Sequence, residues 1–79
     1  MTIANKIRGA MHLKGVSMQE LASALGIQPT ALSTKFYRGS FSSVDLILIA
    51  EKLGFELCFI DDTNKITFDK DNIPQKKKE

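Results

Sequence analysis

The first 54 residues carry apolar side chains at helical spacing, whereas apolar and polar residues alternate after Gly54. Apolar residues three and four positions apart share one face of a helix, and alternating ones share one face of a strand. The pattern predicts helices over 2–14, 18–25, 29–37 and 43–53, and a β-hairpin that pairs 55–60 with 66–69.

Several residues indicate where these helices begin and end. Ser17 and Glu20 have the spacing of a capping box, in which each side chain accepts a hydrogen bond from the other residue's backbone amide. Ser42, with Asp45 three residues later, offers a second cap. Gly26 is predicted to adopt a positive φ and end the second helix. Gly9 lies inside the first helix, where glycine costs roughly 1 kcal/mol relative to alanine.

The predicted fourth helix and hairpin contain more apolar residues than one small core needs. The stretch 44–50 is apolar almost all the way round, and it includes Ile47 and Leu48. In the hairpin, Phe55, Leu57 and Phe59 are expected to cover the helices, which leaves Cys58 and Ile60 apolar on the opposite face.

The net charge of +2 conceals two unlike halves. Five basic residues and one acidic residue give 1–43 a charge of +4, whereas three basic and seven acidic residues give 44–71 a charge of −4. The segment 72–79 adds +2. A basic half indicates a polyanionic partner, although a solvated surface has the same composition.

Composition argues against several functions. One cysteine and one histidine are too few for an internal disulfide or a zinc site, so no metal and no cofactor are expected. No paired acid and base or activated nucleophile is evident, which argues against an enzyme. The longest apolar run has five residues, so no membrane span is expected, and the cytoplasm is the expected compartment.

The segment 17–39 has the mechanical features of a helix-turn-helix. Ala22 is small enough for a second helix to cross it closely, and Gly26 makes the turn. Ile27 and Leu32 wedge the two helices at a fixed angle. A fixed angle allows the second helix to enter a DNA major groove, which is about 12 Å wide.

Residues 3–54 resemble the lambda-repressor-like (Xre/Cro-type) helix-turn-helix domain of bacteria and phage. The matching residues are Ile7, Gly15-Val16-Ser17, Glu20-Leu21-Ala22, Leu25-Gly26-Ile27, Leu32-Ser33, and Asp45-Leu46, Ile49-Ala50 and Leu53-Gly54. The stretch 32–39 is also similar to a subgroup of short regulators from Gram-positive bacteria and their mobile elements, in which a predicted hairpin follows the domain.

The resemblance implies a mainly α fold, with a four-helix lambda-repressor-like domain over 1–54. A C-terminal hairpin over 55–71 and a flexible basic tail over 72–79 follow it. It also implies a sequence-specific regulator of transcription, expected to be a repressor, that binds double-stranded DNA through the helix near 29–37.

Residues that the resemblance places against DNA fall into two groups. Those expected to contact bases are Gln28, Thr30, Ala31, Ser33 and Thr34. Those expected to contact phosphates are Gln19, Lys35, Tyr37, Arg38 and Ser40. Gln28 is the strongest candidate because a primary amide can bond to both N6 and N7 of adenine. Tyr37 has an alternative place as a partly buried core ring.

The surplus of apolar residues predicts a two-fold homodimer. An isolated two-stranded hairpin is marginally stable and has open edges, and a second copy would remedy both. The residues expected in the dimer interface are Ile47, Leu48, Cys58 and Ile60. Alternatively, Ile47 and Leu48 cover the hairpin within one chain. A different function is also open, in which the hairpin and fourth helix form an antitoxin-like or other protein-interaction module with a protein partner.

Overall fold

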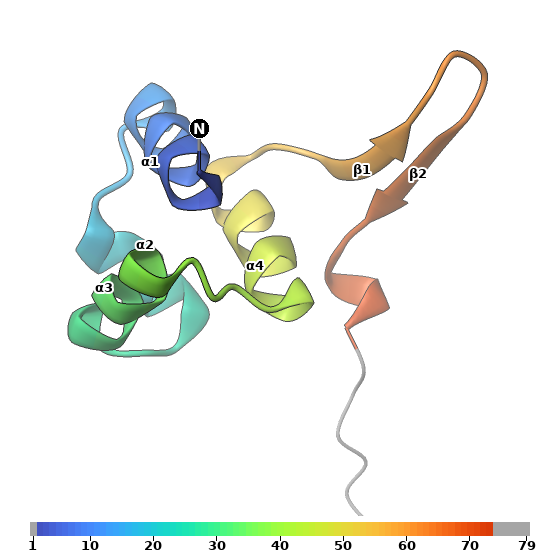
Figure 1. Cartoon of the computed structure of the whole chain (residues 1–79). Coiled ribbons are helices and arrows are strands. Elements are labelled where there is room, and N and C mark those ends of the chain that lie inside the picture. The colour runs from blue at the N-terminus through green and yellow to red at the C-terminus, as the bar shows by residue number, and fades with distance from the viewer. Residues whose placement is uncertain (1, 74–79) are drawn as a thin grey trace, which may run out of the picture.

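The computed structural model describes residues 2–73, in which four helices are followed by a small sheet (Figure 1). The helices are α1 (Ile3–Lys14), α2 (Met18–Leu25), α3 (Pro29–Arg38) and α4 (Ser43–Leu53). The strands are β1 (Leu57–Ile60) and β2 (Lys65–Phe68), and a short 3-10 helix, η1 (Lys70–Asn72), follows them. The predicted mainly α fold with a C-terminal hairpin is confirmed.

Capping interactions fix the ends of the helices where the sequence predicts them. The Ser17 hydroxyl accepts a hydrogen bond from the Glu20 amide at 3.1 Å, and the Ser17 amide donates to the Glu20 carboxylate at 2.8 Å. Ser42 and Asp45 make the same pair of bonds at 3.0 and 2.9 Å. Gly26 ends α2 with φ at 73°, a left-handed conformation that other residues rarely adopt.

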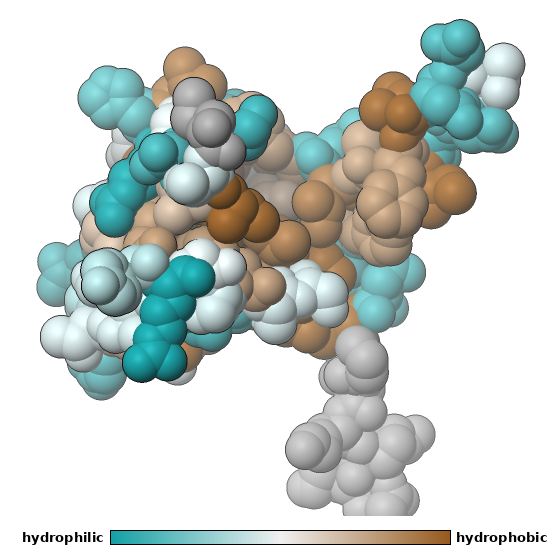
Figure 2. Space-filling model, in the orientation of Figure 1, coloured by the Kyte–Doolittle hydropathy of each residue, from teal (hydrophilic) through white to brown (hydrophobic). Residues whose placement is uncertain are grey.

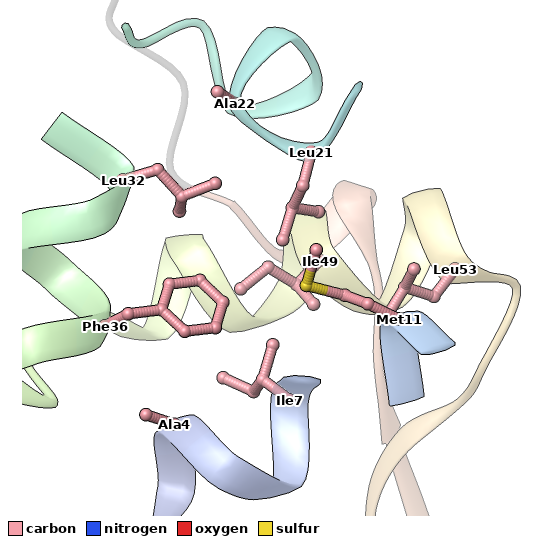
Figure 3. Packing of buried hydrophobic residues seen from close by; sticks show 9 residues of the cluster. All are labelled: Ala4, Ile7, Met11, Leu21, Ala22, Leu32, Phe36, Ile49 and Leu53. Atoms are coloured by element: carbon pink, nitrogen blue, oxygen red, sulfur yellow. The ribbon is translucent and has the colours of Figure 1, made fainter. Parts of the chain in front are cut away.

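The core of the helical domain is assembled from one face of each helix. Leu21 of α2 and Leu32 of α3 are completely buried. Helix α4 contacts α1 and α2 on one side and β1 and η1 on the other. In α1 the buried residues are Ala4, Ile7 and Met11, whereas Ile3 is 43% exposed. Figure 3 shows the cluster, which consists of Ala4, Ile7, Met11, Leu21, Ala22, Leu32, Phe36, Ile49 and Leu53.

The hairpin extends away from the helical domain, and its two faces differ in chemistry (Figure 1). Residues directly opposite each other on paired antiparallel strands share a face. The pairs Leu57–Phe68 and Phe59–Ile66 therefore form one face, which we call the apolar face. The pairs Cys58–Thr67 and Ile60–Lys65 form the other, which we call the mixed face.

The direction of the hairpin corrects part of the prediction. Leu57 is half-buried against the domain. Phe55, although 41% exposed, lines a groove with Ile7 of α1, and its ring centre lies 4.8 Å from the Lys14 ammonium. Phe59 is 70% exposed, so it does not cover the helices as expected. The physical reason is that only the base of the hairpin lies near α4. Strand β1 is two residues shorter than predicted, β2 begins and ends one residue earlier than predicted, and η1 occupies part of the segment assigned to the hairpin. Of the predicted tail, 74–79 lie outside the described residues.

The four residues expected to contact a second chain are not equivalent. Ile47 is 6% exposed and lines a groove with Leu57 and Phe68, so it already packs against the hairpin within the chain, which is the alternative that the sequence left open. Leu48 is half-buried. It lies three residues after Asp45, so these two residues share one face of α4, and Ile47 lies on another. Cys58 is half-buried, whereas Ile60 is 68% exposed.

Gly9 is predicted to weaken α1 without any benefit to packing. A methyl group built on Gly9 would meet no atom within 4 Å, so no neighbouring helix requires a glycine there. Gly9→Ala is therefore expected to raise the free energy of unfolding by about 0.5–1 kcal/mol. As a control, Gly26→Ala should lower it by about 1–2 kcal/mol because alanine is strained in the left-handed region. Urea unfolding measures both, and a Gly9→Ala variant less stable than wild type would contradict the account.

Candidate nucleic-acid interface

Helix α3 has a buried side and a polar exposed side. Leu32 and Phe36 are its buried residues, and they join the core cluster. The residues predicted to contact bases are all exposed: Gln28, Thr30, Ala31, Ser33 and Thr34. The structure therefore brings this predicted group together on one helix, with its side chains outside the core.

Two side chains on this surface retain the capacity to bind a base. Gln28 is the N-cap residue of α3, but its side chain makes no capping hydrogen bond, so both ends of its amide are available to a ligand. The Thr34 hydroxyl donates to the Thr30 carbonyl oxygen at 3.2 Å. That bond leaves the lone pairs of the hydroxyl able to accept a further hydrogen bond.

The residues predicted to contact phosphate flank this surface. Arg38 and Ser40 are exposed at the C-terminal end of α3, and Gln19 is exposed in the first turn of α2. Tyr37 is 90% exposed, so its alternative place as a core ring is wrong. An exposed phenol and an exposed guanidinium are both hydrogen-bond donors that a phosphate oxygen can accept from.

Lys35 differs from the other predicted phosphate contacts because it already has a partner. Its ammonium lies 2.9 Å from the Asp45 carboxylate, and both side chains are largely withdrawn from solvent. Asp45 also caps α4, so one carboxylate joins the C-terminal half of α3 to the start of α4. The capping pattern in the sequence indicated the first role of Asp45, but no local signal indicated its pairing with a lysine ten residues earlier.

The ionisation of Asp45 reflects opposing effects. Partial burial alone would raise the pKa of its carboxyl group. The hydrogen bond from the Ser42 amide and the nearby Lys35 ammonium stabilise the charged form more strongly, and the pKa therefore lies below its ordinary value of 3.8. Asp45 is thus a carboxylate at neutral pH, and it neutralises much of the Lys35 charge.

A second link to α3 comes from α1. The Arg8 guanidinium lies 4.6 Å from the centre of the Phe36 ring, a cation–π contact. Phe36 also packs edge-on against Phe41, with ring centres 5.2 Å apart. These contacts hold the C-terminal half of α3 between α1 and the loop before α4.

The acidic turn of the hairpin lies at the opposite end of the molecule from α3 (Figure 1). Asp61 accepts hydrogen bonds from the amides of Thr63 and Asn64, and these bonds lower the pKa of its carboxyl group. Asp62 adds a second carboxyl group to the same turn. The negative charge of this turn therefore repels a polyanion from the hairpin and favours its approach to the helical end.

Residues 2–73 contain no group of three or more His, Cys, Asp or Glu side chains arranged to hold a metal ion. In the same residues, no helix has the length and apolar character that crossing a membrane requires.

The comparison with known families gives one match. Residues 5–60, more than two thirds of the chain, match the family model described as the bacteriophage CI repressor helix-turn-helix domain. No curated protein and no solved structure shows a significant match. The matched residues include α1 from its third residue onward, the whole of α2, α3 and α4, and β1.

The role of Asp45 predicts a pH dependence of stability. Asp45→Asn is expected to lower the free energy of unfolding at neutral pH by about 1 kcal/mol, because a charged cap and an ion pair are lost. Since the folded pKa is depressed, the contribution of the carboxylate is present above pH 3.8 and is lost as the pH falls through the lower folded value.

The test compares urea unfolding of wild type and Asp45→Asn at about pH 7 and about pH 2, and the difference should shrink in acid. Asp62→Asn, at the exposed hairpin turn, is the control and should change stability by less than about 0.5 kcal/mol at either pH. A difference for Asp45→Asn that is the same at both pH values would contradict the assigned role.

Proposed function

This chain belongs to the family of bacteriophage CI repressor helix-turn-helix domains, and we propose that it is a homodimeric repressor that binds a specific DNA sequence. DNA-binding regulation is what the family match supports directly. The observation that carries the finer proposal is the exposed polar side of α3, which sits on a buried anchor made of Leu32 and Phe36.

In the proposed complex, α3 lies in the major groove and its exposed side faces the base edges. A major groove about 12 Å wide admits one α-helix. Gln28 is placed at the N-terminal end of α3, the part of a recognition helix that contacts bases in this class of domain. Its amide can donate to adenine N7 and accept from adenine N6 at the same time. Thr30, Ser33 and Thr34 supply shorter hydroxyl contacts beside it.

Phosphate contacts fix the position of α3 in the groove. Arg38 and Tyr37 extend from its last turn, and Gln19 from the first turn of α2 approaches the backbone on the other side of the groove. We expect Lys35 to contribute less than Arg38, because releasing its ammonium to a phosphate would leave the Asp45 carboxylate without that partner. Its main role is to position α3 against α4.

A homodimer would present two copies of α3 to one face of the duplex. In dimeric helix-turn-helix proteins the half-sites are spaced about 34 Å apart, one turn of DNA. A dimer bound across such a site can block the access of RNA polymerase without any further domain. Repression by occupancy of an operator therefore needs only the elements described for this chain.

The exposed hairpin favours a second candidate function. Phe59 and Ile66 are 70% and 58% exposed on the apolar face of the hairpin, and contiguous exposed apolar side chains mark protein-interaction sites. The same surface could bind a different protein, as an antitoxin-like module does. Purification of the chain from its host with a stoichiometric second protein, and without DNA binding, would support this candidate.

The proposed base contacts predict a loss of sequence discrimination in a double variant. Duplexes selected from a random pool by wild type should bind it far more tightly than a scrambled duplex. Gln28→Ala combined with Thr34→Ala should reduce that ratio at least tenfold, because each good base contact supplies about 1–3 kcal/mol of discrimination. Affinity for the scrambled duplex should change little.

Mobility-shift assays at a fixed salt concentration measure the ratio, and circular dichroism confirms that the variant is folded. Arg38→Met is the matched control, since loss of a phosphate contact should weaken binding to both duplexes alike. The proposed assignment of base contacts fails if the double variant keeps the wild-type ratio.

A further inference from the structure

The apolar face of the hairpin is exposed along its outer half. Phe59 is 70% exposed and Ile66, directly opposite on β2, is 58% exposed. Phe59 packs edge-on against Phe68 with ring centres 5.0 Å apart, so the face is continuous from the base of the hairpin outward. Figure 2 shows apolar side chains gathered over both strands below a polar tip.

We propose that this apolar face docks on the apolar face of a second copy of the chain and forms the dimer interface. The inference rests on the proposed homodimer and assigns its surface. It differs in part from the sequence-based prediction of Ile47, Leu48, Cys58 and Ile60. Ile47 and Cys58 line the groove that adjoins this face, whereas Leu48 and Ile60 are not among its lining residues.

A groove adjoins the exposed ring of Phe59. It lies between α4 and the base of the hairpin, has a volume of about 210 Å³, and is lined chiefly by apolar side chains, among them Leu46, Ile47, Leu57 and Phe68. An apolar cavity of roughly 150 Å³ is large enough to bind benzene. The groove therefore has room for one phenylalanine side chain from outside the chain.

The groove and the Phe59 ring together make the surface self-complementary. A two-fold dimer requires that the same patch on both subunits fit itself. Here the largely exposed Phe59 ring is itself one of the side chains that line an apolar recess on the same face. With a two-fold axis through the face, the Phe59 ring of each copy enters the groove of the other, so both are used and the assembly closes at two chains.

The mixed face is less suited to burial. Ile60 is 68% exposed, but its cross-strand neighbour is Lys65, whose ammonium pairs with the Glu56 carboxylate. Thr67 lies opposite Cys58 on the same face. Docking on this face would remove an ion pair from water, and desolvation of such a pair can exceed the attraction between its charges.

The area available sets the expected strength of the dimer. A large aromatic side chain buries about 150–250 Å², so Phe59, Ile66 and the groove would contribute on the order of 300–400 Å² of apolar surface per copy. A standard stable interface buries about 800 Å² per partner. The interface is therefore at the small end, where association is weak or transient, and we expect a weak dimer that tightens on a two-half-site duplex.

Two pairs of variants test the face directly by sedimentation equilibrium between about 1 and 300 µM, a range wide enough to detect the weak association typical of a small interface. Phe59→Lys and Ile66→Lys should each weaken dimerisation at least tenfold. Ile60→Lys and Thr67→Lys, on the mixed face of the same two strands, should leave it within twofold of wild type. All four side chains are exposed, so each variant should fold, and circular dichroism checks this.

The inference is overturned if wild type stays monomeric throughout this range, or if Ile60→Lys disrupts the dimer and Phe59→Lys does not. Binding to a duplex with a single half-site, taken from the selected pool, tests DNA recognition without dimerisation. It therefore distinguishes failure of this inference from failure of the proposed function. Phe59→Lys should bind it with wild-type affinity, because α3 is unchanged. If neither protein binds any duplex, the proposed function fails, whereas the sedimentation result still decides the docking face.

Discussion

The burial of Leu21 against Leu32 is the contact on which the candidate DNA-binding surface depends. These are the two side chains that the structure buries completely, one from α2 and one from α3. Ala22 beside them is 1% exposed, and its small size allows α3 to cross α2 closely. Because interiors are closely packed, a change of volume at this crossing would tilt α3 and move every polar side chain on its outer face.

Two further links fix α3 at its C-terminal half. The Lys35–Asp45 pair joins it to the start of α4, and Phe36 lies between Arg8 of α1 and Phe41. A short helix with few buried residues would otherwise fray at this end, close to Arg38, which we propose as a phosphate contact. The arrangement means that DNA would meet a preformed surface and would not need to order the helix on binding.

The sequence predicted the features that are set by residues close together in the chain, such as the ends of helices. It did not predict contacts between residues of different helices and strands. Helix ends were predictable because a capping serine and its acidic partner are three residues apart, as Ser17 and Glu20 show. The Lys35–Asp45 pair was not, since it joins two helices. Alternation in β1 separated two faces but could not show which one meets α4. For that reason the sequence placed Phe59 against the helices and left open whether Ile47 meets a second chain or its own hairpin, whereas the structure exposes Phe59 and buries Ile47.

The central claim is that the outer face of α3 meets DNA while the hairpin faces away from it. The most direct measurement is a titration of isotopically labelled protein with a selected duplex, followed by the backbone amide chemical shifts of the whole chain. We predict the largest changes between Gln28 and Ser40 and at the start of α2, with small changes from Asp61 to Lys65. Changes concentrated in the hairpin, with the amides of α3 unmoved, would contradict the account.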